Sequence, residues 1–192
     1  MSTEDPAKRD DHELVRRMAL KDGRALEVFY DRYHRVAFAL VLRIVRVRQE
    51  AEDVLAEVFW QVWRQASRYT PSRGKPLAWL LTIARTRAID NLRASNRRPT
   101  LDSGGDEIEE AADSRALQED PSLRAGARLA VSRCLELLTR EQRVPLEMAY
   151  FEGMSHSEIA AALNQPLGTM KDRIRTGMMN LRKCLKPFEA GA

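Results

Sequence analysis

Two cysteines are the residues of this sequence that could bind a metal, act as nucleophiles or form a disulfide. Their spacing does not suit a metal site. Cys134 and Cys184 lie fifty positions apart, and neither belongs to a CxxC pair. The three histidines, at positions 12, 34 and 156, lack the spacing of zinc ligands. The sequence also contains no Gly-rich phosphate loop, GxSxG elbow or HExxH pair. We therefore expect no metal, no cofactor and no enzymatic activity.

A second chemically informative segment mixes cations with aromatic rings, as single-stranded nucleic-acid sites do. Residues 67–76 (SRYTPSRGKP) form a breaker-rich loop, and a helical pattern follows over residues 78–98. Cations can follow a phosphate backbone while loops and rings receive unstacked bases. Arg87 lies among the cations of this helix. An ordinary amphipathic helix with an arginine-rich outer face is the alternative. The candidate contacts are Tyr69, Arg73, Lys75, Trp79, Thr82, Arg85, Thr86, Asp90, Arg93, Arg97 and Arg98.

The preceding helix, predicted over residues 51–64, has an outer face that is typical of a binding surface. At 100° per residue its core side would consist of Leu55, Val58, Phe59 and Val62. The opposite side places an indole beside carboxylates, and an exposed tryptophan flanked by charge is a common binding anchor. The alternative is that Trp60 packs on a neighbouring helix above a solvated acidic face. This outer face consists of Asp53, Ala56, Glu57, Trp60, Gln61 and Arg64.

The C-terminal part of the sequence has a helix-turn-helix pattern. Residues 155–163 predict a short capped helix, residues 164–166 a turn, and residues 167–185 a longer helix. The first residues of such a second helix meet base edges in the major groove. A helical hairpin without DNA contact is the alternative. Packing between the helices is expected from Ile159, Ala160, Leu163, Met170, Ile174 and Leu181. Outward DNA contacts are expected from Thr169, Lys171, Asp172, Arg173 and Arg175.

These segments predict an all-α protein of two small helical domains. Apolar residues recur at helical spacing over residues 12–98 and 122–188, and no segment alternates as a strand would. The net charge is only +4, but acidic residues gather in residues 99–121, which we expect to be a flexible linker. We expect a disordered tail over residues 1–11 and a second tail over residues 189–192.

Helix boundaries and core faces can be predicted more finely in both domains. Two helix starts have the capping-box pattern, at Thr139 with Gln142 and at Ser155 with Glu158. The inward stripe of the arginine-rich helix is expected to be Leu81, Ala84, Ala88 and Leu92.

No stretch approaches the roughly 20 apolar residues of a membrane span. Because the N-terminal residues also differ from a signal peptide, we expect a cytoplasmic protein.

The sequence resembles the extracytoplasmic-function (ECF) sigma factors, group IV of the sigma-70 family. Residues 51–93 (AEDVLAEVFW to NLR) are similar to their first conserved domain, sigma region 2, and residues 138–182 (LTREQRVPLE to NLR) to their second, region 4. The resemblance implies a protein that binds core RNA polymerase, directs it to promoters and promotes DNA opening. It also implies regulation by an anti-sigma factor, which is often membrane-bound.

The resemblance assigns a role to each candidate surface. The outer face of residues 51–64 would bind the clamp helices of the largest polymerase subunit, and region 4 would bind the flap of the second largest. Ala56 replaces the usual glutamine, which would weaken the clamp contact. The loop of residues 69–76 and the following helix would capture the minus-ten strand, and residues 169–175 would read the minus-35 duplex. Asp172 replaces a frequent serine and would repel phosphate, although it could accept a hydrogen bond from cytosine N4.

The two cysteines leave two alternatives open. Cys134 belongs to the first predicted helix of the second domain and Cys184 to the end of its last. If those helices pack together, a reversible disulfide would couple redox state to DNA binding or to the inhibitor contact. Two buried small hydrophobic side chains are the favoured alternative in a cytosolic protein.

Two other functional classes compete with the sigma-factor prediction. A helix-turn-helix regulator that binds duplex DNA without polymerase would leave the acidic, aromatic face of residues 51–64 unexplained. A helical adaptor for acidic proteins or RNA would not need a helix-turn-helix. The adaptor would also show no promoter-dependent stimulation of transcription.

Overall fold

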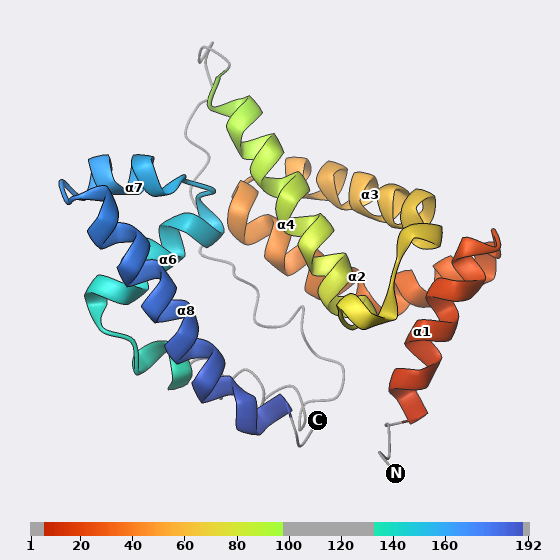
Figure 1. The fold of residues 1–192 in the computed structure, drawn as a ribbon. Helices are drawn as coiled ribbons and strands as arrows, with labels where there is room; N and C mark the ends of the chain where they lie inside the picture. Colours follow the sequence, from red (N-terminus) through yellow and green to blue (C-terminus); the bar gives the residue numbers. More distant parts are fainter. Residues whose placement is uncertain (1–5, 98–132, 190–192) are drawn as a thin grey trace. The chain divides into compact units, whose positions relative to one another are not determined.

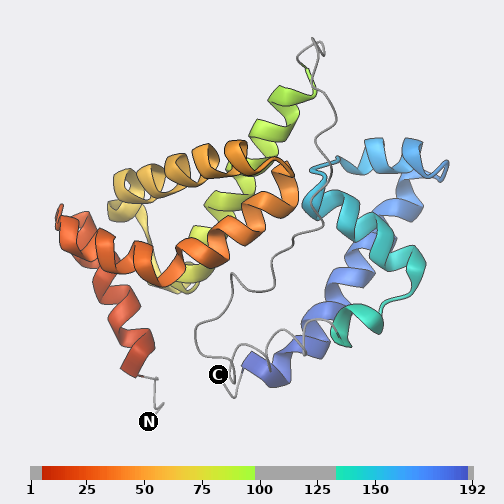
Figure 2. The ribbon, with the colours of Figure 1, turned by 180° about the vertical axis from the view of Figure 1, so that it is seen from behind.

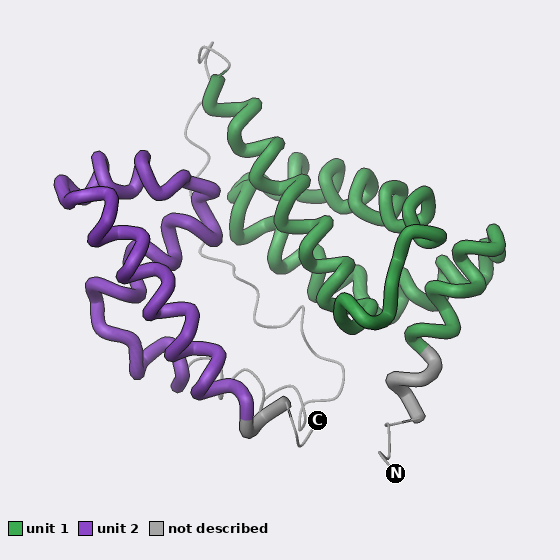
Figure 3. Tube along the Cα trace, in the orientation of Figure 1, with its two compact units in different colours: residues 1–117 green, residues 118–192 purple. Residues whose placement is uncertain are grey.

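The structure, a computed structural model, describes residues 6–97 and 133–189. Every regular element in these two ranges is a helix, so the all-α prediction is confirmed. The chain divides into two units, residues 1–117 and 118–192 (Figure 3). The predicted linker, residues 99–121, and Arg98 lie outside the described residues.

The first unit is a helical bundle in which α2, α3 and α4 pack against one another (Figure 1). Helix α1 crosses the end of α2 and lies beside the segment that follows α3, as both ribbon views show (Figures 1 and 2). Phe29, Val58 and Leu80 are fully buried, one from each of the three packed helices. The elements are α1 Pro6–Ala19, α2 Gly23–Val45, α3 Arg48–Gln65, η1 Ala66–Arg68, η2 Pro71–Arg73 and α4 Pro76–Ser95.

Local chemistry explains where these helices begin and end. The Asp22 carboxylate caps α2 by accepting from the Arg24 N–H at 3.0 Å. Its hydrogen bonds from Arg17 lower the pKa of Asp22, so the cap is charged. Arg46 ends α2 in the left-handed conformation, with φ 68°. Pro76, which lacks an N–H to leave unpaired, is the first residue of α4.

Two expectations for the first unit are corrected. Helix α1 begins at Pro6, so residues 6–11 are not part of a disordered tail, and Asp11 is bonded to Arg32 and Tyr33 of α2. The buried face of α4 is also wider than the predicted stripe, because α4 packs against both α2 and α3. Leu81 and Leu92 are only half-buried. The buried residues of α4 are Pro76, Leu80, Ile83, Ala84, Ala88 and Ile89.

The described part of the second unit, residues 133–189, consists of a helical turn at residues 133–136 and three longer helices. Ile159, Ala160, Met170 and Ile174 form its core, with Leu163 and Leu181 packed against it, which confirms the predicted helix-turn-helix packing. Ser155 makes the predicted capping box with Glu158, whereas Thr139 is an N-cap without a side-chain hydrogen bond. The helices are α6 Arg140–Phe151, α7 His156–Ala162 and α8 Leu167–Glu189.

A disulfide joins the first and last parts of the described residues of this unit, so the favoured alternative of two unpaired cysteines is wrong. Cys134, in the turn of residues 133–136, is bonded to Cys184 of α8, with 5.8 Å between their Cα atoms. Cys134 is fully buried and Cys184 is half-buried. Across the described parts of both units, no helix combines the length and the apolar character that crossing a bilayer requires.

Candidate polymerase and nucleic-acid interfaces

The outer face of α3 presents the predicted anchor to solvent. Trp60 is 62% exposed, so the alternative that its indole packs on a neighbouring helix of the first unit is wrong. Asp53, Ala56, Glu57 and Arg64 are also exposed, and Gln61 is half-buried. The opposite side of α3 is buried through Leu55, Val58, Phe59 and Val62, as predicted. A large ring beside carboxylates on a rigid helix suits a protein partner with apolar and basic side chains.

Arg87 extends this surface from α3 onto α4. Its Nε donates to the Oε1 of Gln61 at 2.5 Å, and its Nη1 lies 3.7 Å from the Oε2 of Glu57. The sequence pattern placed Arg87 among the cations of the basic helix, but the structure turns it toward the acidic face. Arg85 and Arg87 are two positions apart and lie on different sides of α4, and the packing of α4 on α3 decides which side meets the acidic face.

A stripe of exposed polar side chains follows the outer side of α4. Thr82, Thr86, Asp90, Arg93 and Arg97 are all exposed and recur every three or four residues, so they share one face. The hydroxyls of Thr82 and Thr86 donate to the carbonyls one turn earlier, at 2.8 and 2.9 Å. Each hydroxyl oxygen can therefore still accept a hydrogen bond from a base or sugar. Arg85 is half-buried beside this stripe.

The loop before α4 is closed by a hydrogen bond across it. The Tyr69 hydroxyl donates to the Gly74 carbonyl at 2.7 Å, and the Tyr69 ring lies 5.2 Å from that of Trp79. Burial, more than the charge of Asp11, raises the pKa of Tyr69, so the phenol remains a donor. Gly74 has φ 138°, a conformation that side chains disfavour. The predicted contacts Arg73 and Lys75 lie at the exposed part of this loop.

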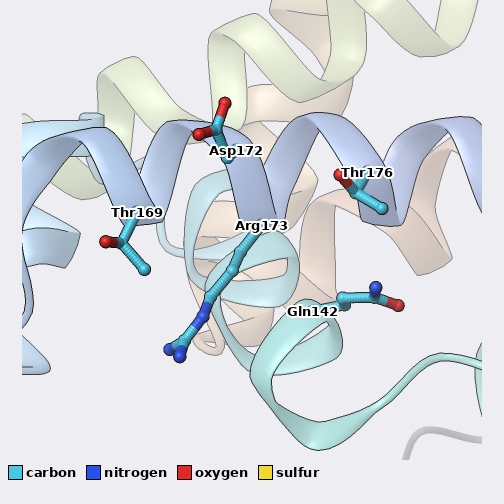
Figure 4. A pocket seen from close by; sticks show the side chains of 5 residues that line it. All are labelled: Gln142, Thr169, Asp172, Arg173 and Thr176. Atoms are coloured by element: carbon cyan, nitrogen blue, oxygen red, sulfur yellow. The ribbon is translucent and has the colours of Figure 1, made fainter.

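The N-terminal half of α8 carries the predicted duplex contacts on two different sides. Lys171, Asp172 and Arg175 are exposed, and Thr169 is half-buried. Figure 4 shows Asp172 and Arg173 leaving α8 in opposite directions. Arg173 is half-buried and lines hollows beside α6, so it does not belong to the outward cluster that the sequence predicted. Its neighbour Ile174 is buried in the core, which places position 173 at the edge of the packed face.

Sequence reasoning missed two polar residues at this end of the second unit. Thr176 of α8 and Gln142 of α6 line one hollow of about 260 Å³ together with Thr169, Asp172 and Arg173 (Figure 4). Thr176 follows Asp172 by one helical turn, a spacing that could have identified it. Gln142 comes from a different helix and had no such signal. Its Oε1 lies 3.5 Å from the Asn180 amide nitrogen.

The two units together match the two conserved parts of sigma-70-type transcription factors. The family model Sigma-70 region 2 matches residues 29–98, and the model Sigma-70, region 4 matches residues 128–181. The ECF RNA polymerase sigma factor SigK of Mycolicibacterium vanbaalenii is 36% identical over 174 residues, covering 90% of this chain and 87% of that protein. The SigK of Mycobacterium ulcerans is 36% identical over 183 residues, with 94% and 96% covered.

A solved structure is also similar. A crystal structure of Rhodobacter sphaeroides SigE in complex with the anti-sigma ChrR shares 26% identity, with a TM-score of 0.47 over 88% of this chain and 97% of that one. The matched regions and the SigK relatives define a sigma-70 family protein. Within that class, the chain belongs to the ECF RNA polymerase sigma factors, which direct the polymerase to promoters. The family predicted from the sequence is confirmed.

Proposed function

We propose that this sigma factor binds core RNA polymerase through the outer face of α3. The observation that carries the proposal is Trp60, which is 62% exposed beside Asp53 and Glu57. A buried tryptophan contact is among the strongest anchors in protein interfaces. The clamp helices of the largest subunit are the proposed receptor, and the flap of the second-largest subunit would receive the second unit. Ala56 offers no side-chain hydrogen bond to this contact.

The first unit would also capture the unpaired non-template strand of the minus-ten element. Arg73, Lys75 and Arg93 would follow its phosphates, while Thr82, Thr86 and Asp90 offer hydrogen-bonding groups to bases and sugars. Trp79 is half-buried against Tyr69, so it supports the loop more than it offers a free stacking surface. Polymerase supplies the chemistry of transcription, and this surface holds the strand that has left the duplex.

The second unit would read the minus-35 duplex with the exposed side of α8. Lys171 and Arg175 are suited to phosphates or guanine edges, and Asp172 is suited to the cytosine amino group. Arg173 would contact the duplex from the side of α8 that faces α6. Because two weak sites on one chain bind cooperatively through effective concentration, promoter recognition would depend on the spacing of the two elements.

Two forms of regulation belong to the same proposal. An anti-sigma factor would cover the polymerase-binding surface in the cytoplasm, because a factor that buries Trp60 competes with core polymerase for the same anchor. The disulfide between Cys134 and Cys184 would make the second unit sensitive to redox state, because it joins the two ends of that unit. Two free thiols counted in the oxidised protein would end the redox part of the proposal.

The test is co-elution with bacterial core polymerase on size exclusion, combined with a titration of affinity. A Trp60→Ala plus Asp53→Ala variant should bind core at least about 30-fold more weakly, the loss expected for one hot-spot residue. A Thr86→Ala plus Asp90→Ala variant is the matched control, because it also removes one carboxylate from an exposed helix face. It should retain core binding.

Each outcome of this experiment has a distinct meaning. Equal binding by the parent and the Trp60 variant would place the anchor elsewhere and overturn the assignment to α3. Failure of the parent to bind core would overturn the function as a whole and favour an autonomous DNA-binding regulator.

A further inference from the structure

Helix α1 touches the loop proposed to capture the minus-ten strand. His12 and Tyr69 are 57 residues apart, yet the His12 Nδ1 lies 2.9 Å from the Tyr69 hydroxyl oxygen. Their ring centroids are 5.8 Å apart. Tyr69 has a single hydroxyl proton and donates it to the Gly74 carbonyl. The His12 Nδ1 must therefore carry a proton and act as the donor, so the hydrogen bonds run from His12 through Tyr69 to Gly74.

The neighbouring residue holds α1 in place. The Asp11 carboxylate accepts hydrogen bonds from the Arg32 guanidinium and the Tyr33 hydroxyl, both on α2. Burial, assisted by Asp11, raises the pKa of Tyr33, so this phenol also remains a donor. Leu14 and Val15, in the next turn of α1, are fully buried. His12 thus approaches Tyr69 from a helix that is anchored on both sides of it.

The loop itself is supported from beneath and exposed at its tip. Tyr69 contacts His12 on one side and Trp79 of α4 on the other, and its hydroxyl closes the loop on Gly74. Residues 70–75 between these supports are all exposed. A loop whose conformation is set before binding loses less entropy when a base enters it. Part of this support comes from α1, which precedes the residues matched by the region 2 model, since that match begins at residue 29.

We propose that α1 is part of the minus-ten recognition device and that His12 is a positioning residue, which acts through Tyr69 to set the conformation of residues 70–75. Base preference at the loop then depends on a helix outside the matched region. This inference rests on the proposed role of the loop in strand capture.

The test uses holoenzyme assembled from core polymerase and the full-length chain. Fluorescent fork-junction DNAs would carry a single-stranded non-template minus-ten segment, lack a minus-35 element, and differ from one another at one base. His12→Ala should raise the Kd of the preferred fork about five- to tenfold, the value of about one net hydrogen bond. It should also reduce the difference between preferred and altered bases. His12→Asn should retain most of both, because its amide can place a donor near the position of Nδ1.

Three controls separate positioning from general damage. The affinity of His12→Ala for core polymerase should equal that of the parent. In a Tyr69→Phe background, His12→Ala should cause no further loss, since the acceptor of its hydrogen bond is gone. His156→Ala, the same chemical change at an exposed residue of the second unit, should leave fork binding unchanged.

The contrary outcomes are also distinct. Parent and His12→Ala holoenzymes with equal affinity and equal base preference would overturn the inference while leaving the proposed function intact. A parallel loss of core affinity in His12→Ala would overturn it by indicating a structural role only. A parent holoenzyme that does not distinguish the forks would overturn the capture role of the loop, and the inference with it.

Discussion

At the scale of single residues, the role of an arginine depends on the side chains that it contacts as well as on its charge. Arg85 and Arg87 are two positions apart in one helix, and both are half-buried. Arg87 contacts Gln61 and Glu57, because the packing of α4 on α3 brings that side of α4 to the acidic face. The ion pair is solvent-exposed, with 43% of the Arg87 side chain and 64% of the Glu57 side chain accessible. Such a pair contributes little to folding but can hold a binding surface in one conformation.

We therefore predict that Arg87→Ala changes core-polymerase binding more than stability. The free energy of unfolding should change by less than about 1 kcal/mol, as is usual for exposed ion pairs. The Kd for core should rise about threefold to fivefold, because ordering a free side chain on binding costs roughly 0.5–1.5 kcal/mol. Urea unfolding and a core titration measure the two effects.

A double-mutant cycle tests whether Arg87 affects core affinity through Glu57 and Gln61. In a Glu57→Ala plus Gln61→Ala background, Arg87→Ala should have no additional effect on core affinity. Arg68→Ala, an equal loss of charge at another exposed position of the first unit, is the control and should bind core normally. An undiminished loss in the double background would indicate that Arg87 contacts polymerase directly.

At the scale of elements, the helix-turn-helix depends on how its short helix is capped. Helix α7 has only seven residues, too few to be stable alone, so its first turn needs partners for its free N–H groups. The Ser155 hydroxyl oxygen accepts from the Glu158 N–H, and the Glu158 carboxylate accepts from the Ser155 N–H at 2.6 Å. Thr139 precedes α6 with a similar sequence pattern but makes no side-chain hydrogen bond. One pattern therefore has two structural outcomes.

This difference gives a matched pair of variants. Ser155→Ala should lower the stability of the second unit by about 1 kcal/mol, the usual cost of a lost N-cap. Thr139→Ala should cost clearly less, because no cap hydrogen bond is removed. Chemical unfolding followed by far-ultraviolet circular dichroism measures both. Equal losses would mean that Thr139 caps α6 in solution, contrary to the structure.

At the scale of the whole molecule, each unit has its own core. The residues that report on unfolding, cysteines and tryptophans, are divided between the two units. Both cysteines belong to the second unit, whereas all three tryptophans, at positions 60, 63 and 79, belong to the first. The disulfide closes a segment of 50 residues. It therefore constrains the unfolded state of the second unit alone.

We predict that reduction destabilises only the second unit. The loop-closure relation gives about 4 kcal/mol for a segment of this length. With reductant, the transition followed by circular dichroism should gain an early component, while the transition followed by tryptophan fluorescence stays in place. A Cys134→Ser plus Cys184→Ser variant should behave like the reduced protein in either buffer. An equal shift of the fluorescence transition would show that the units unfold together.

The sequence by itself determined the helical class, the two-domain division, the family, and most exposed positions of the candidate surfaces. These follow from periodicity, caps and motif spacing, which are properties of neighbouring residues. Only the tertiary structure decided which side Arg173 takes, which partners Arg87 finds, that Cys134 meets Cys184, and that His12 supports Tyr69. Each of these depends on how one helix packs on another, and the partners lie up to 57 residues apart, beyond the reach of local patterns.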